Sequence, residues 1–77
     1  MRQKIARKVR KGILRIGAKI IYEGTIAEGD WPKKHLGYEC DIEINGKECW
    51  CAGRDPLSAY RLALETAEEI KNGELIF

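Results

Sequence analysis

Three cysteines and one histidine are the residues whose types could carry chemistry. Cys40, Cys49 and Cys51, with His35 as a fourth donor, have the composition of a zinc site. Zinc ligands usually lie two to four residues apart on a turn, whereas Cys49 and Cys51 are separated by a single residue within a predicted strand. A nucleophilic cysteine would need an exposed thiolate beside His35. We expect the thiols to face the core, and therefore expect no metal, no cofactor and no catalytic residue.

A β-hairpin positions these thiols. Residues 38–44 alternate apolar and acidic side chains, which is typical of a strand with one buried face. Asn45-Gly46 favours a two-residue type I′ turn, and residues 47–53 return as the second strand. This turn pairs Cys40 with Cys51, where a disulfide is chemically allowed but disfavoured in a reducing cytoplasm. One face then holds Tyr38, Cys40, Ile42, Ile44, Cys49 and Cys51, and the other holds Glu39, Asp41, Glu43, Glu48 and Trp50.

A C-terminal helix is predicted to cover the apolar face of the hairpin. Asp55 is a good N-cap, Pro56 suits the first helical position, and Gly73 is a typical stop. Leu62 is the exception on the polar side of this helix. The apolar arc at helical spacing comprises Leu57, Ala59, Tyr60, Ala63, Leu64, Ala67 and Ile70.

The first third of the chain fits two patterns. Residues 5–10 and 13–27 can be two further strands, although Ile5, Val9, Ile13, Ile16 and Ile20 also follow helical spacing. Gly12 and Gly17 would each cost a helix up to ~1 kcal/mol, which favours strands. Residues 29–37 have the composition of a loop. The predicted fold is α+β: a three- to four-stranded antiparallel β-meander with one C-terminal helix packed on one face, forming a single domain over residues 1–77.

The chain resembles a family of small bacterial proteins annotated only as a domain of unknown function. The resemblance rests on Ile5-Ala6 near the start, Asp30-Trp31 in the loop, and a helix entry that runs from Gly53 through Asp55-Pro56-Leu57 to Leu62-Ala63-Leu64-Glu65. Ser58 departs from the glutamine that family members usually have. This resemblance implies a fold and no function.

A helix over residues 2–11 would instead give the order α-β-β-β-α, which is similar to the double-stranded RNA-binding domain. That family places a lysine cluster at the start of its last helix, where the cations reach phosphates. Here the helix starts with Asp55-Pro56-Leu57-Ser58. RNA binding in that mode is therefore not expected.

Charge is distributed unevenly along the 77 residues, although the net charge is only +2. Residues 1–19 hold eight Lys or Arg and no acid, whereas the remainder holds six Lys or Arg and all twelve Asp or Glu. Such asymmetry indicates either an anionic partner or attraction between two halves of one sheet. No apolar run approaches the ~20 residues that span a bilayer, and no secretory signal is recognised, so we expect no membrane contact and a cytoplasmic location.

The predicted function is a non-catalytic protein–protein interaction module, an accessory or inhibitor protein of a bacterium or phage. Its partner would be another protein or a second copy in a homodimer, because one sheet face stays open. The candidate partner-binding residues are Trp31, Trp50, Arg15, Lys19 and Leu62. The alternative is a protein that binds nucleic-acid backbones through its basic N-terminal segment: Arg2, Lys4, Arg7, Lys8, Arg10 and Lys11.

Overall fold

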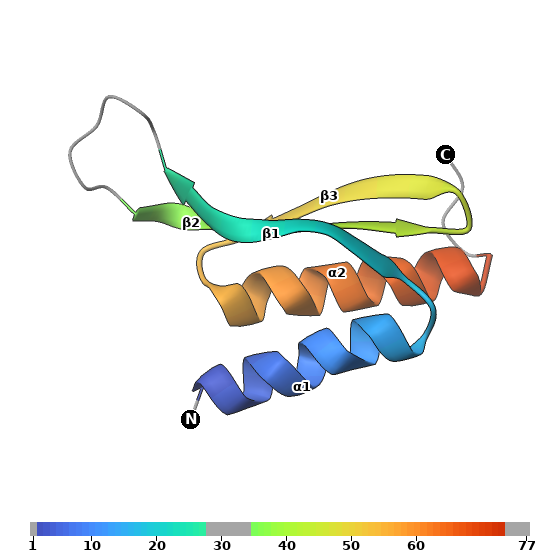
Figure 1. Cartoon of the computed structure of the whole chain (residues 1–77), viewed down its shortest axis with the longest axis horizontal. Coiled ribbons are helices and arrows are strands. Elements are labelled where there is room, and N and C mark those ends of the chain that lie inside the picture. Colours follow the sequence, from blue (N-terminus) through green and yellow to red (C-terminus); the bar gives the residue numbers. More distant parts are fainter. Residues whose placement is uncertain (1, 28–34, 74–77) are drawn as a thin grey trace.

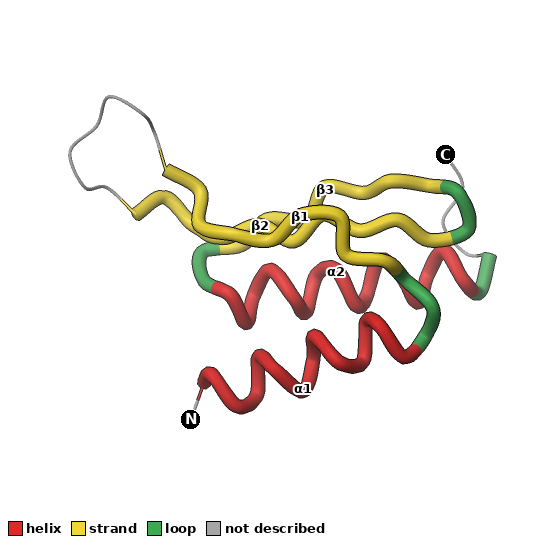
Figure 2. Tube along the Cα trace, viewed as in Figure 1, coloured by secondary structure: helices red, strands yellow, loops and turns green. Residues whose placement is uncertain are grey.

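A sheet and two helices make up the described part of the chain. The computed structural model describes residues 2–27 and 35–73, in the order α1 (Arg2–Arg15), β1 (Lys19–Ala27), β2 (His35–Ile44), β3 (Lys47–Gly53) and α2 (Pro56–Lys71). The three strands form an antiparallel sheet in the order β1-β2-β3, and both helices lie on the same side of it (Figures 1 and 2). The predicted α+β class, with a β-meander and a C-terminal helix on one face, is confirmed. Neither described helix is long and apolar enough to cross a membrane.

The hairpin of β2 and β3 has the predicted register. Cys40 pairs with Cys51 and Ile42 with Cys49. Asn45 and Gly46 have φ of 54° and 80°, the positive values that a type I′ turn requires. Cys40, Ile42, Ile44 and Cys51 are buried beneath α2, while Trp50 lies on the opposite face. Period-two alternation therefore placed both faces of the hairpin correctly.

The C-terminal helix also begins and ends as predicted. The carboxylate of Asp55 accepts a hydrogen bond of 2.8 Å from the backbone N–H of Ser58, which caps the first turn. At the other end Gly73, with φ of 77°, donates its N–H to the carbonyl of Ile70. The buried side of α2 carries Leu57, Ala59, Tyr60, Ala63, Ala67 and Ile70. Ala59, Ala63 and Ala67 are fully buried, because small side chains let the helix lie close to the sheet.

The N-terminal segment is a helix, so the prediction of a strand over residues 5–10 was wrong, as was a strand beginning at residue 13. Gly17 does not argue against a helix in this segment, because it lies at the C-terminal end of α1. With φ of 101° it donates to the carbonyl of Leu14, and Ala18 donates to that of Ile13, which is the Schellman pattern. A Cβ on Gly12 would lie 3.7 Å from Leu64 of α2, so this glycine stands at the contact between the two helices.

Packing between α1 and α2 buries the apolar stripe of α1. Ala6 and Ile13 are buried, and Val9 and Ile16 pack beside them. The helix packs mainly on α2 and reaches the sheet only at β1, so that α2 lies between most of α1 and the sheet (Figure 1). Helix formation here depends on this tertiary contact rather than on local preference.

A β-bulge at Ile21 decides which side chains of β1 face the helices. Ile20 pairs with Ile42 and Tyr22 pairs with Asp41, so Ile21 is an extra residue without a partner. Uninterrupted alternation would place Tyr22 on the same face as Ile20, whereas the bulge turns Tyr22 outward and brings Glu23 opposite Cys40, on the helix side.

Two further predictions concern the loop and the C-terminus. Residues 35–37 belong to β2 rather than to the predicted loop. The rest of that loop, with Trp31, lies outside the described residues. So do Leu75, Ile76 and Phe77, whose apolar side chains predict packing along the sheet edge or the helix.

Candidate binding surfaces

The cysteines that could have carried chemistry lie in or beside the core. Cys40 and Cys51 are 0% and 2% exposed, and Cys49 is partly buried. Burial raises the pKa of Cys40 to about 12 and raises the pKa values of Cys49 and Cys51 as well. Protonated thiols are poor nucleophiles and poor metal ligands. The predicted core packing of Cys40 and Cys51 is confirmed; the side chain of His35 is outside the description.

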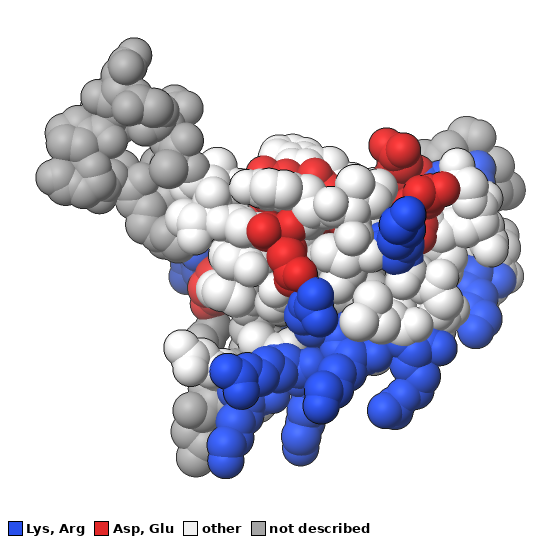
Figure 3. Space-filling view, in the orientation of Figure 1, with Lys and Arg blue, Asp and Glu red and all other residues white. Residues whose placement is uncertain are grey.

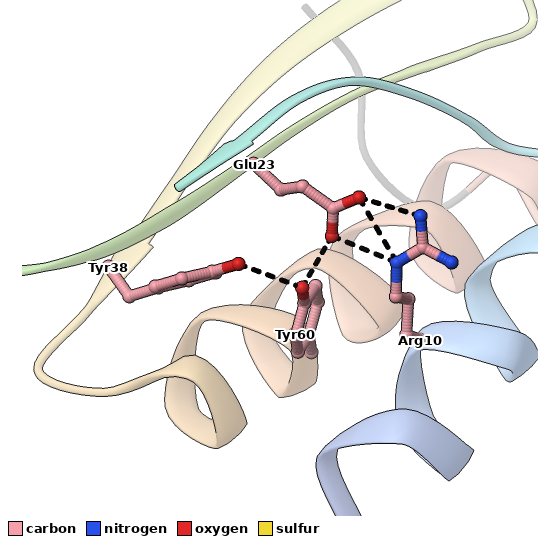
Figure 4. A network of polar contacts seen from close by, with 4 residues as sticks. All are labelled: Arg10, Glu23, Tyr38 and Tyr60. Atoms are coloured by element: carbon pink, nitrogen blue, oxygen red, sulfur yellow. Dashed lines mark hydrogen bonds and ion pairs between the residues drawn. The ribbon is translucent and has the colours of Figure 1, made fainter. Parts of the chain in front are cut away.

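A polar network inside the molecule joins all the main elements except β3 (Figure 4). Arg10 of α1 binds the carboxylate of Glu23 on β1 with both Nε and Nη2, and the shortest N–O distance is 2.6 Å. The hydroxyl of Tyr60 on α2 donates to Glu23 Oε1. Because the Tyr60 hydroxyl is the donor in its hydrogen bond to Glu23, it accepts a hydrogen bond from the hydroxyl of Tyr38 on β2, 3.1 Å away. The two rings pack at a centroid distance of 5.6 Å.

The network fixes the protonation states of its members. The hydrogen bonds from Arg10 lower the pKa of Glu23, while burial and the bond to Glu23 raise the pKa of Tyr60. Glu23 is therefore a carboxylate and Tyr60 a neutral phenol near pH 7. Through these contacts the network connects α1 to the sheet by way of Glu23.

The outer face of the sheet is the first candidate binding surface, hereafter the open face. Trp50 is 68% exposed, and Tyr22 and Ile21 are 50% and 47% exposed on the neighbouring β1 side. Strand alternation places four acidic residues around them: Glu39, Asp41, Glu43 and Glu48. Lys19 is the cross-strand neighbour of Glu43 on this face. The open face thus carries acids along its central strand β2, with Tyr22 on β1 and Trp50 on β3 to either side.

Trp50 is held in position on the open face. Its indole N–H donates to Glu39 Oε2 across 2.7 Å, which fixes the ring over β2. Asp41 is the cross-strand partner of Trp50, and its Oδ1 is buried without a hydrogen-bond partner among the described residues. Burial and the neighbouring Glu39 raise the pKa of Asp41 to about 6. A hollow of about 220 Å³ adjoins these groups and is lined by Ile21, Asp41, Glu48, Cys49 and Trp50.

The solvent side of α1 is the second candidate surface, hereafter the basic face. Lys4, Lys8, Lys11 and Arg15 are exposed and follow one another at intervals of four, three and four residues, and Arg7 is exposed beside them. These intervals place the side chains in one stripe along the helix. Lys and Arg gather over α1 while acidic side chains lie toward the sheet (Figure 3). Within the described residues, the five cations form no ion pair.

A groove between α1 and the start of α2 has a volume of about 260 Å³. Arg7, Arg10 and Tyr60 line it together with Asp55 and Leu57. Its acidic N-cap and the commitment of Arg10 to Glu23 weaken any attraction for an anion. We assign it no ligand.

The predicted partner-binding residues are not gathered in one place. Trp50 and Lys19 lie on the open face, whereas Arg15 ends α1 and belongs to the basic face. Alternation along the predicted strand over residues 13–27 would place Arg15 on the same sheet face as Lys19; this is wrong, because Arg15 is helical. Leu62 is exposed at 41% on α2, which covers the other side of the sheet.

Among the predicted nucleic-acid-binding residues, Lys4, Arg7, Lys8 and Lys11 lie on the basic face. Arg10 does not, since it pairs with Glu23. The side chain of Arg2 lies outside the description. Sequence analysis missed Glu23, Tyr38 and Tyr60 as a network. The available signal was Ile21, an apolar residue on the otherwise polar side of the predicted strand, at the position where the bulge occurs.

Comparisons with known proteins add no relatives to this picture. The chain matches no family model, no curated protein and no solved structure. The functional argument therefore rests on the surfaces.

Proposed function

We propose that this protein is a non-catalytic protein–protein interaction module that docks its partner on the open face. The observation that carries the proposal is the 68% exposure of Trp50 on β3, in register with Asp41 and Tyr22 across a sheet face whose other side is covered by α2. A tryptophan is a costly residue to leave in water and is enriched at the centres of protein interfaces. Ile21 and Tyr22 on β1 add a second exposed apolar area, and the acids of the central strand β2 lie between it and Trp50.

The distribution of reactive groups supports a binding role over catalysis. The thiols are buried with raised pKa values, and the internal carboxylate is saturated by Arg10 and Tyr60. Three free thiols also suit a reducing compartment, in line with a cytoplasmic role. Another protein or a second copy of the chain would occupy the open face.

A photocrosslinking experiment tests this proposal. Trp50 is replaced by benzoylphenylalanine in the native cells, and Glu65 on the exposed side of α2 is replaced in the same way as a control. We expect a discrete adduct from position 50 and none from position 65, since only the first lies on the open face. The partner identified in the adduct, purified separately, should bind the wild-type chain. Light scattering at two concentrations separates a second copy from another protein. Equal crosslinking from both positions contradicts the proposal.

The basic face supports a second candidate function, the binding of nucleic-acid backbones. It presents five exposed cations along one helix. The start of α2, where the double-stranded RNA-binding domain carries lysines, reads Asp55-Pro56-Leu57-Ser58, so any contact would be made by α1 instead. Contacts from such a stripe would be to phosphates, with strong salt dependence and little sequence preference.

Gel shifts with DNA and RNA at two salt concentrations test the second candidate. The double variant Lys8→Gln/Lys11→Gln should reduce the slope of log K against log salt by about 1.8, because two phosphate contacts are lost. Arg61→Gln/Lys71→Gln on α2 removes the same charge from exposed positions and should leave the slope unchanged. A shift that responds equally to both variants, or no salt-sensitive shift, removes this function.

A further inference from the structure

The open face combines three features that together specify a partner. Trp50 offers an exposed π-surface whose orientation is fixed by the bond to Glu39. Asp41, directly across the strands from Trp50, has a buried oxygen that lacks a donor among the described residues. Glu43 and Glu48 add negative charge to the same face. A cation placed here would meet an aromatic ring and carboxylates at once.

We propose that the open face binds an arginine-containing segment of a partner protein, with a guanidinium stacked on Trp50 beside the carboxylates of Glu39 and Asp41. This inference rests on the proposed function and names the chemistry of the partner. Cations over a tryptophan ring are attracted by its quadrupole, and arginine is the more frequent partner. Its planar guanidinium stacks on an aromatic ring and presents a fork of donors that matches carboxylates, whereas lysine presents a single point charge.

The surroundings of Asp41 support a cation rather than a neutral group. Burial and the charge of Glu39 act together to disfavour its carboxylate. A guanidinium between them would supply the missing donor and offset the repulsion between the two acids. The hollow beside Trp50 is open enough, at about 220 Å³, to admit the end of an arginine side chain.

A second copy is the competing occupant, because α1 offers Arg7 and Arg15 on the basic face. The open face and the basic face lie on opposite sides of the molecule, with α2 between them (Figures 1 and 3). Two copies therefore cannot satisfy each other's faces in a closed dimer, and contacts of this kind would continue from copy to copy. Docking of a separate arginine-bearing partner avoids open-ended growth.

Titration with synthetic peptides tests the inference on the full-length chain. Trp31→Phe leaves Trp50 as the single tryptophan, whose fluorescence reports binding of octa-arginine. We expect saturable binding that octa-lysine matches only weakly. Trp50→Ala, measured by calorimetry, should weaken octa-arginine binding about tenfold, since stacking and charge act together at this site. Trp50 is exposed, so this variant should fold, which circular dichroism checks.

A matched pair of variants separates a defined site from general attraction of opposite charges. Glu39→Gln/Asp41→Asn should weaken octa-arginine binding as strongly as Trp50→Ala. Glu65→Gln/Glu68→Gln removes the same charge from exposed positions on α2 and should have little effect. Equal loss in both double variants, or unchanged binding by Trp50→Ala, overturns the inference.

Two further outcomes are decisive. A peptide of residues 2–16 that binds as well as octa-arginine, with molecular mass rising with concentration in light scattering, would assign the face to a second copy and overturn the separate partner. An adduct at position 50 in cells without octa-arginine binding would refute the arginine inference alone. Absence of that adduct would refute the proposed function itself.

Discussion

Glu23→Gln should lower the free energy of unfolding by about 2 kcal/mol, because hydrogen bonds to charged groups are worth roughly 1.5–3 kcal/mol and two partners lose theirs. Arg10 would keep its charge without its carboxylate, and Tyr60 would lose a strong acceptor. In a domain of this size the midpoint of thermal unfolding should fall by roughly 8–16 °C. Thermal unfolding followed by circular dichroism measures the change.

The same substitution should alter the response to acid. Interaction with Arg10 lowers the pKa of Glu23 in the folded state relative to the unfolded chain. A lowered carboxyl pKa stabilises the fold above the unfolded value of about 4.3 and loses that contribution as pH falls through the folded value. The stability difference between wild type and Glu23→Gln should therefore be full at pH 7 and shrink below about pH 4.

Glu65→Gln on the exposed side of α2 is the control for the Glu23 prediction. It removes the same charge without touching the network and should change stability by less than about 0.5 kcal/mol. An equal effect of both substitutions, or a Glu23 effect that persists in acid, would show that the network does not hold α1 to the sheet.

Gly53→Ala should destabilise the fold by about 3 kcal/mol, at the upper end of the usual cost of overpacking. A Cβ at this position would lie 2.7 Å from Ser58 Cβ, 2.8 Å from the backbone nitrogen of Ala59 and 2.9 Å from the carbonyl carbon of Ser58. Two of these atoms belong to the backbone of the capped first turn of α2, so they cannot rotate away. Chemical denaturation measures the loss, and the N-cap of Asp55 should weaken with it.

Gly12→Ala provides the opposite result in the same experiment. Its Cβ would lie 3.7 Å from Leu64, an ordinary contact, and alanine favours a helix over glycine by up to ~1 kcal/mol. This variant should gain roughly that amount. Loss of stability at Gly12 equal to that at Gly53 would contradict the helical assignment of α1, and unchanged stability of Gly53→Ala would contradict the close approach described at Gly53.

The arrangement of charged side chains in the fold shows where the unevenly distributed charges of the sequence lie. Only Arg10 among the cations of α1 forms an ion pair within the described residues, and it is the one that points toward the sheet. The cations of the basic face, Lys4, Arg7, Lys8, Lys11 and Arg15, are exposed. Basic side chains gather over α1, away from the acidic ones toward the sheet (Figure 3). Attraction between two halves of one sheet, the simpler of the two interpretations of the sequence, applies to Lys19, whose cross-strand neighbour is Glu43, but not to Arg10, because Arg10 lies on a helix.

The local sequence by itself determined the hairpin of β2 and β3 and the two ends of α2. Alternation with Asn45-Gly46 gave the hairpin, its register and the faces of Cys40 and Trp50. Asp55, Pro56 and Gly73 gave both ends of α2. These patterns suffice because a turn or a cap is stabilised by neighbours in the chain.

Only the tertiary structure decided the N-terminal third and the network. Gly12 is acceptable in α1 because Leu64, 52 positions later, packs against it, and no local propensity carries that information. The bulge at Ile21 reversed the faces of Tyr22 and Glu23, because the pairing of β1 with β2 outweighed simple alternation. Tyr60, which sequence placed only as an apolar contact, became the hydroxyl that links Glu23 to Tyr38, since contacts between distant segments exist only after the chain has folded.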